Sequence, residues 1–243
     1  MDETVVGSPR ERYRQQVREE IKAHAWAQVA TTGASALSLN AIAKLMGVSG
    51  PALYRYYRSR DELITELVLD AYRDVVGTCQ DAAARGTTAN GRLAAAATAL
   101  RGWAVAAPHR YLLIFGTPVP GYAAPPETTA ILVRLMVVML DAFAEAEDAS
   151  EPPADGPPDG PVDRPADLRG VPATTAAVEA DLAVHRGWAG GHPASPAVLR
   201  RALTFWTRLH GVISLELAGH FEGMAFDPAL LYAEEVDAAV RRT

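Results

Sequence analysis

The sequence predicts an all-α protein, and three observations lead to that prediction. Apolar residues recur at steps of three and four along most of the chain, as on one face of an amphipathic helix. No run of six or more residues alternates cleanly between apolar and polar, so no β-strand is expected. Capping residues and glycines separate the helical segments. The expected helices span residues 10–31, 39–46, 50–57, 60–84, 89–106, 108–115, 127–146, 174–188, 197–221 and 228–242.

Length and composition indicate a globular chain with a substantial core. It has 243 residues, 49% of them hydrophobic, and a single cysteine, Cys79. One cysteine excludes an internal disulfide framework and a Cys-rich metal site. The chain shows no signal-sequence pattern and no apolar stretch long enough to span a bilayer. We therefore expect a soluble, cytoplasmic protein with no membrane partner.

Charge is unevenly distributed along the chain. The formal net charge is −6, but residues 1–60 carry 9 Lys/Arg against 5 Asp/Glu, whereas the remainder carries 14 against 24. This asymmetry allows the first segment to approach phosphates while the rest of the chain serves another purpose.

A short helix followed by a glycine turn begins at Ser38. Ser38 is placed to cap that helix, and its inner face is assigned to Ile42, Ala43 and Leu45. The small Ala43 allows a second helix to cross closely. Gly47 supplies the tight turn that residues with a Cβ atom resist.

A second capped helix follows the turn directly. Val48 is expected to fill the angle between the two helices, and Ser49 is expected to cap the second one. Pro51 occupies the first turn, where its missing N–H costs nothing. Leu53 and Tyr57 can face inward. Helix, glycine turn and capped second helix form the helix-turn-helix pattern, although such a hairpin commonly does no more than pack.

The helix predicted over residues 60–84 has a clear beginning. Ser59 can cap it, and Glu62 stands at the third helical position, which gives a reciprocal Ser-x-x-Glu capping box. An apolar stripe from Leu63 to Val75 follows at helical spacing.

The run IAKLMGVSGPALYRYYRSRDEL, residues 42–63, resembles the DNA-binding signature of the TetR family, whose usual form is close to IAxxAGVSxxxLYxYFxSKxxL. The resemblance covers residues 10–75. It implies a three-helix DNA-binding domain, residues 10–58, and a helical-bundle domain, residues 59–243, for ligand binding and dimerisation. It also implies that double-stranded operator DNA is a partner.

By position, the resemblance assigns phosphate contacts to Tyr54 and Arg60. Arg60 stands where lysine is usual, which keeps the charge, and Tyr57 stands where phenylalanine is usual, which keeps the packing. The first turn offers few donors, so direct base readout would depend on Asn40, Arg55 and Tyr56. The complete set of candidate DNA-binding residues is Ser38, Asn40, Ser49, Gly50, Pro51, Ala52, Tyr54, Arg55, Tyr56 and Arg60.

The C-terminal half resembles the WHG-type domain of some TetR-like regulators. The resemblance lies in residues 106–122 and 205–221, where Trp206, His210 and Gly211 match the Trp, His, Gly set. Between these blocks, residues 149–172 are rich in Pro, Gly and Asp, which predicts a flexible connection.

The helix over residues 197–221 is apolar nearly all round. Such a helix is buried on more than one side, so this helix and the one over residues 228–242 are the predicted homodimer interface. The alternative is that both belong only to the monomer core.

A regulator of this kind needs a small-molecule inducer and an apolar pocket with a few polar groups. Each aromatic or histidine candidate is more often a core residue than a ligand contact. The candidate pocket residues are Trp103, His109, Tyr111, Phe115, Tyr122, Met136, Phe143, Trp206 and His210.

Enzyme motifs are absent from the sequence. It contains no HExxH pair, no phosphate-binding glycine loop and no Gly-x-Ser-x-Gly elbow. We therefore expect neither catalysis nor a cofactor or metal. The sequence predicts a ligand-responsive repressor that binds palindromic operator DNA as a homodimer. A scaffold that kept this fold without using DNA, and an activator, are the alternatives.

Overall fold

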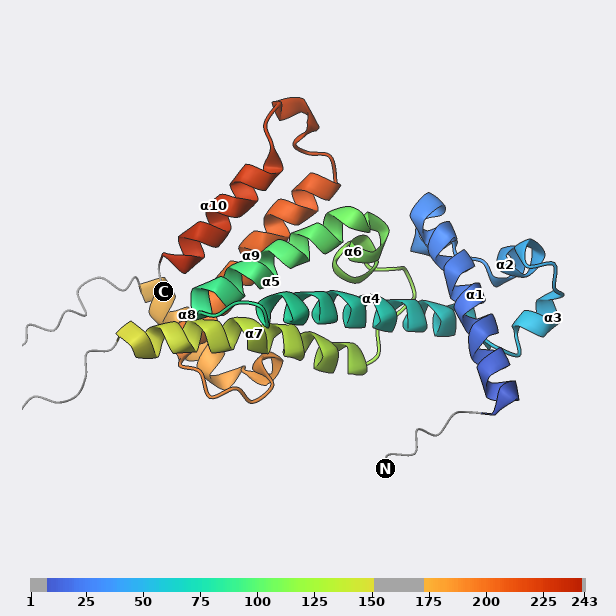
Figure 1. Ribbon diagram of the computed structural model, residues 1–243, viewed down its shortest axis with the longest axis horizontal. Helices are drawn as coiled ribbons and strands as arrows, with labels where there is room; N and C mark the ends of the chain where they lie inside the picture. The colour runs from blue at the N-terminus through green and yellow to red at the C-terminus, as the bar shows by residue number, and fades with distance from the viewer. Residues whose placement is uncertain (1–7, 151–172, 242–243) are drawn as a thin grey trace, which may run out of the picture. The chain divides into compact units, whose positions relative to one another are not determined.

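The computed structural model describes residues 8–150 and 173–241, and within these ranges every element is helical (Figure 1). The α-helices are α1 Pro9–Thr32, α2 Leu39–Leu45, α3 Gly50–Leu53, α4 Arg60–Ala83, α5 Ala89–Ala106, α6 Pro108–Phe115, α7 Glu127–Ser150, α8 Ala173–Val184, α9 Pro196–Leu217 and α10 Pro228–Val240. Three short 3-10 helices join them, namely η1 Ala34–Ala36, η2 Gly187–Ala189 and η3 Glu222–Met224. The all-α prediction is confirmed.

Most of the predicted helix ends lie within a few residues of the observed ones. The helix predicted over residues 174–188 is divided into α8 and η2. The helix predicted over residues 127–146 continues to Ser150 and so takes the first two residues of the proline-rich segment. The rest of that segment lies outside the described residues. None of the described helices is long and apolar enough to cross a membrane.

The chain forms two compact units. The first unit is Met1–Asp74 with Ala106–Thr128, and the second unit is Val75–Val105 with Thr129–Thr243. Helix α4 supplies residues to both, and α6 belongs to the first. These units are defined by contacts, so the functional division at residues 58 and 59 stays a prediction.

The first unit is built around one apolar cluster. Helix α1, the pair α2 and α3, and the first half of α4 each bury one face in it, and Val119 joins from the loop after α6. The fully or nearly fully buried members are Ile21, Ala25, Val29, Leu37, Leu39, Ile42, Ala43, Leu53, Tyr57, Leu63, Ile64, Leu67, Val68 and Val119. Local signals fix the limits of α1, which begins with a Ser8–Glu11 capping box and ends at Gly33, where φ is 79°.

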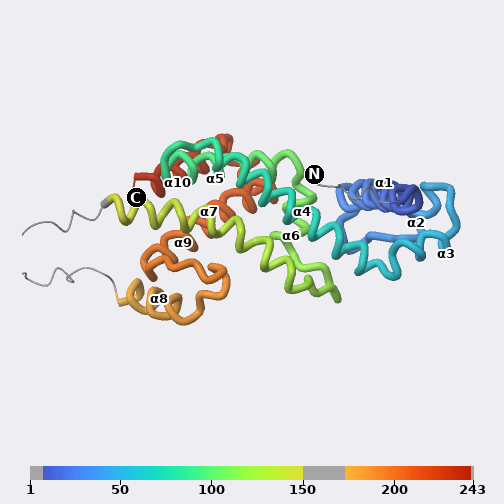
Figure 2. The backbone as a smooth tube through the Cα atoms, turned by 60° about the horizontal axis from the view of Figure 1, so that its bottom comes forward, coloured from blue at the N-terminus to red at the C-terminus, as the bar shows by residue number. Residues whose placement is uncertain are grey.

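In the second unit, α8 and α10 both pack against α9. Helices α9 and α10 run antiparallel, and α8 packs against α9 (Figures 1 and 2). The buried face of α9 consists of Val198, Leu199, Ala202, Phe205, Leu209, Val212 and Ile213. Large apolar side chains remain exposed on the same helix pair, with Leu215 at 45% and Leu230 at 71%. Exposed leucines on these helices are compatible with the predicted dimer interface.

The single cysteine lies in the core of the second unit. Cys79 is completely buried, and burial raises the pKa of its thiol to about 12, because the apolar surroundings disfavour the thiolate. The thiolate is the reactive form, so we expect Cys79 to resist iodoacetamide in native protein at pH 8 and to react quickly in denaturant. Mass spectrometry of timed samples measures both rates. Native labelling as fast as denatured labelling would contradict the burial.

Candidate nucleic-acid interface

The predicted helix-turn-helix consists of α2, a glycine turn and α3. Ser38 caps α2, since its hydroxyl accepts a hydrogen bond from the N–H of Ala41 at 3.3 Å. Gly47 adopts a φ of 68°, and the N–H of Val48 closes the turn on the carbonyl of Ala43 at 3.0 Å. A left-handed residue at this point is the reason for glycine in the sequence.

The N-terminus of α3 lies close against α2. A Cβ atom on Gly50 would stand 3.2 Å from Oδ1 of Asn40, so glycine permits this approach. Two predicted site residues on different helices are thereby brought together. Ser49 occupies the N-cap position of α3, but its side chain makes no capping hydrogen bond to the helix. Its hydroxyl is a donor of the kind that holds phosphates.

The predicted DNA-contacting residues divide by exposure. Those on the surface are Asn40, Ser49, Pro51, Tyr54 and Arg55, while Ser38, Gly50, Ala52, Tyr56 and Arg60 are half-buried. Lys44 and Arg58 are also exposed and add positive charge around the helix pair. A short helix with a partly exposed first turn flanked by cations has the form needed to enter a major groove.

Two packing predictions were wrong. Leu45 is 65% exposed and Val48 is 42% exposed, although the sequence placed the first on the inner face of α2 and the second between the helices. Helix α2 has only seven residues, and its buried positions Leu39, Ile42 and Ala43 already cover the core-facing side. The observed turn directs Val48 outward.

The second helix of the pair is also shorter than predicted. Helix α3 ends at Leu53 and not at Tyr57, and tighter bonds follow it, from Arg55 N–H to the Ala52 carbonyl at 3.3 Å and from Tyr56 N–H to the Leu53 carbonyl at 2.9 Å. Because the chain does not continue as a helix after this turn, the carbonyls of Arg55 and Tyr56 stay available, and arginines of α1 donate to both.

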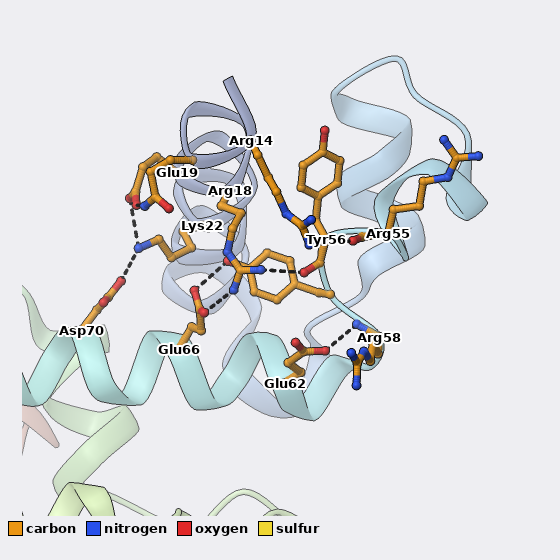
Figure 3. A network of polar contacts seen from close by, with 12 residues as sticks. Arg14, Arg18, Glu19, Lys22, Arg55, Tyr56, Arg58, Glu62, Glu66 and Asp70 are labelled. Carbon is orange, nitrogen blue, oxygen red and sulfur yellow. Dashed lines mark hydrogen bonds and ion pairs between the residues drawn. The ribbon is translucent and has the colours of Figure 1, made fainter. Parts of the chain in front are cut away.

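Helix α1 supplies those two arginines (Figure 3). Nη2 of Arg14 donates to the carbonyl of Arg55 at 3.5 Å, and Nη1 of Arg18 donates to the carbonyl of Tyr56 at 2.8 Å. The segment after α3 is therefore fixed to α1 through its backbone, while the side chain of Arg55 points away from α1 (Figure 3).

Arg18 also joins α1 to α4. It forms an ion pair with Glu66, and its guanidinium lies 4.3 Å from the centre of the Tyr57 ring. The hydroxyl of Tyr57 donates to Oε2 of Glu66 at 2.9 Å. Burial and then this carboxylate raise the pKa of Tyr57, so the phenol stays neutral and remains a donor.

A second ion-pair group on the same two helices supports this connection. Lys22 bridges Asp70 of α4 at 2.7 Å and Glu19 of its own helix at 3.0 Å (Figure 3). Arg18 and Glu66 are not among the candidate residues predicted from the sequence. One sequence feature could have indicated Glu66: it directly precedes Leu67, a buried residue of the apolar stripe of α4, so its charge lies at the edge of that stripe.

The start of α4 carries a modified capping box. Ser59 accepts from the N–H of Glu62 at 3.1 Å as predicted, but the Glu62 carboxylate accepts from the N–H of Arg58 at 2.6 Å (Figure 3). Arg60 donates to the carbonyls of Ala34 and Ser35 at 2.8 and 3.0 Å. A phosphate contact by Arg60 therefore stays a prediction. To make it, the guanidinium must either bind the phosphate with its other N–H groups or break its hydrogen bonds to these two carbonyls.

The nine candidate pocket residues are divided between the two units. His109, Tyr111, Phe115 and Tyr122 belong to the first unit, whereas Trp103, Met136, Phe143, Trp206 and His210 belong to the second. Three of them line cavities, and each lines a different one: His109 one of about 440 Å³, Phe143 one of about 160 Å³ and Trp206 one of about 10 Å³. Their common role in a pocket stays a prediction.

Helix α2, the turn at Gly47 and helix α3 form a helix-turn-helix unit. Comparison with family models gives two matches, to "Bacterial regulatory proteins, tetR family" over residues 21–67 and to "Tetracyclin repressor-like, C-terminal domain" over residues 93–239. The chain belongs to the TetR family of transcriptional regulators, as the resemblance in the sequence predicted. It is a regulator and not an enzyme.

Individual relatives agree with this assignment. The HTH-type transcriptional regulators Rv1816 of Mycobacterium tuberculosis and Mb1846 of Mycobacterium bovis are 35% identical over 224 residues, covering 90% of this chain and 88% of each relative. The regulatory protein SCO4313, whose crystal structure is known, is 53% identical in sequence to this chain. The two structures have a TM-score of 0.77, with 96% of this chain and 98% of that one covered. The TetR family regulator PfmR of Thermus thermophilus shares the fold at 14% identity, with a TM-score of 0.57 over 91% and 97% of the two chains.

Proposed function

We propose that this regulator is a ligand-responsive repressor that binds palindromic operator DNA as a homodimer and acts in the cytoplasm. The main support is the partly exposed first turn of α3, which lies beside Asn40, together with the backbone after the helix, which is anchored to α1 and α4. A rigidly held recognition helix can keep a defined register in the major groove.

Base readout in this proposal is carried by few side chains. Arg55 is exposed and its guanidinium is directed away from the core, so it can form the bidentate contact that selects guanine (Figure 3). Asn40 has the amide that pairs with adenine, and Pro51 offers apolar contact to a thymine methyl. Tyr54, 44% exposed, contributes its hydroxyl to a phosphate.

The palindrome follows from the proposed dimer. Two identical recognition helices related by a twofold axis read two inverted half-sites about 34 Å apart. The exposed Leu215 and Leu230 on α9 and α10 support a dimer interface on those helices.

Repression would be relieved by a shift in populations. The dimer would have two states, one with the recognition helices spaced to fit the operator and one with a different spacing. A small molecule that binds the second unit and prefers the second state lowers the affinity for the operator. The size of the effect is set by the ratio of the ligand's affinities for the two states. Helix α4 contributes to both units and is therefore the element we expect to change its tilt.

The experiment that tests the proposal is selection from a random double-stranded DNA pool, followed by binding measurements at fixed salt. We expect a palindromic consensus. Arg55→Ala should relax one base position and cost about 1–3 kcal/mol there. Tyr54→Phe should weaken binding to all sequences by about 1 kcal/mol, because it removes one hydrogen bond to the backbone.

Arg241→Ala is the matched control, because Arg241 is an exposed arginine of the second unit whose loss removes the same charge. It should leave binding unchanged. Folded, ligand-free protein that enriches no sequence at low salt would exclude DNA binding and favour the scaffold alternative. Enrichment of a single half-site by a monomeric protein would overturn the dimer.

A further inference from the structure

A charged cavity lies within the second unit, between α7, α9 and α10. Its volume is about 160 Å³. Helix α9 supplies three arginines, Arg200, Arg201 and Arg208, and the apolar part of the wall includes Phe143 of α7 and Phe205 of α9. Of the nine candidate pocket residues predicted from the sequence, Phe143 is the one that lines this cavity.

Arg201 is held in place but has an unsatisfied donor. Its Nη2 donates to Glu147 at 3.0 Å and to the carbonyl of Phe143 at 3.5 Å, and its guanidinium lies 5.8 Å from the centre of the Phe143 ring. Its Nε is buried and has no hydrogen-bond partner within residues 8–150 and 173–241. A buried donor without an acceptor is costly.

The other two arginines have donors to spare. Arg200 uses Nε for Glu179 at 2.8 Å, and Arg208 uses Nη1 for Glu235 at 3.1 Å. A guanidinium carries five N–H groups, so one ion pair leaves several available. Each arginine is paired with one carboxylate, and of these carboxylates Glu235 lines the cavity itself. The guanidinium N–H groups that these ion pairs leave unused, and not an excess of positive charge, favour an anionic ligand.

The apolar part of the wall determines the body of the ligand. The rings of Phe143 and Phe205 meet edge to face, with centroids 5.9 Å apart. A cavity of about 150 Å³ lined by apolar side chains is large enough for benzene. A single ring or a short branched chain therefore fits, and a carboxylate on it can accept from the arginine donors in bidentate fashion.

We propose that this cavity binds a small monocarboxylate with an apolar body, of about the size of benzoate. The proposal rests on the proposed function in one respect, because it gives the chemical class of the ligand to which the repressor responds. The binding itself is a property of the protein without DNA.

The test is calorimetric titration of the full chain at pH 7 with benzoate and with benzamide, its neutral isostere. We expect benzoate to bind at least about 10-fold more tightly than benzamide, because the carboxylate adds charge-assisted hydrogen bonds. Arg201→Met keeps most of the side-chain volume and should weaken benzoate binding by at least about 10-fold. Arg92→Met is the matched control, since it breaks the ion pair between Arg92 of α5 and Glu145 of α7, and neither residue lines the cavity.

A second variant alters the space and leaves the charges in place. Ala239 of α10 lines the cavity, so Ala239→Leu should exclude both compounds while circular dichroism shows a folded protein. This variant decides the matter if Arg201→Met fails to fold. No benzoate binding up to about 10 mM, or equal binding by wild type and Ala239→Leu, would overturn the proposal.

An operator-binding assay with and without benzoate separates the two proposals. If the protein binds the operator but does not bind benzoate, the cavity proposal is wrong and the repressor proposal stands. Benzoate binding that depends on Arg201 supports the cavity, whatever the DNA result.

Discussion

Replacing Tyr57 with alanine is expected to unfold the first unit and to abolish operator binding. The side chain is fully buried, and it lies between the α1 arginine Arg18 and the α4 carboxylate Glu66. Removing a buried aromatic ring costs about 3–5 kcal/mol, because the transfer free energy is lost and a cavity remains. That amount is a large fraction of the stability of a domain. Urea denaturation followed by circular dichroism measures the loss.

Two further substitutions show whether the ring or the hydroxyl is responsible. Tyr57→Phe keeps the ring and removes the hydrogen bond to Glu66, so it should cost about 0.5–1.5 kcal/mol. Tyr54→Ala, on an exposed neighbour, should change stability by no more than about 0.5 kcal/mol. A Tyr57→Ala protein that loses less than about 1 kcal/mol would show that the ring does not hold α1, α3 and α4 together.

Acidification is expected to destabilise the second unit through His210. The imidazole lies in α9 with its ring centre 3.9 Å from that of Trp206, and burial lowers the pKa of His210 to about 4. The unfolded chain binds the proton near pH 6.5, whereas the folded chain does not bind it until about pH 4. The contribution to stability is therefore complete above pH 6.5 and is lost as the pH falls below that value, at about 1.4 kcal/mol per pH unit and about 3 kcal/mol in all.

Comparison of variants isolates this effect from the titration of carboxylates and of His109, whose pKa burial also lowers. The slope of the unfolding free energy against pH gives the number of protons taken up on unfolding. Between pH 6.5 and 4, His210→Gln should lower that number by about one. His185→Gln makes the same change at an exposed histidine and is the matched control for the substitution itself. Parallel curves for wild type and His210→Gln would show that His210 is not kept neutral by the fold.

Local signals explain why the helices could be predicted from the sequence. Helices α1 and α4 begin within one residue of the predicted positions, because their capping residues are near in sequence and act at short range. The end of α3 depends instead on Arg14 and Arg18, which lie about 40 residues earlier and bind the carbonyls that follow the helix. No local pattern contains that information.

The candidate interface was predictable to a similar degree. The glycine turn and the cap at Ser38 follow from the sequence, and so does the burial of Leu53 and Tyr57. The exposure of Val48 does not, since periodicity over two turns of helix cannot decide between the two sides of a turn. The unsatisfied Arg201 donor depends on packing between α7, α9 and α10, which sequence spacing does not reveal.

The sharing of α4 between the two units limits how this regulator can be recombined with others. A fragment that stops at residue 58 would leave the partners of Leu63, Leu67 and Val68 exposed, and it would also lack Glu66. Val119 fills the same core from a loop that follows α5 and α6 in the chain, so even a fragment ending at Asp74 would be incomplete. Operator specificity is therefore better transferred by exchanging the exposed side chains of α2 and α3 than by exchanging whole N-terminal segments.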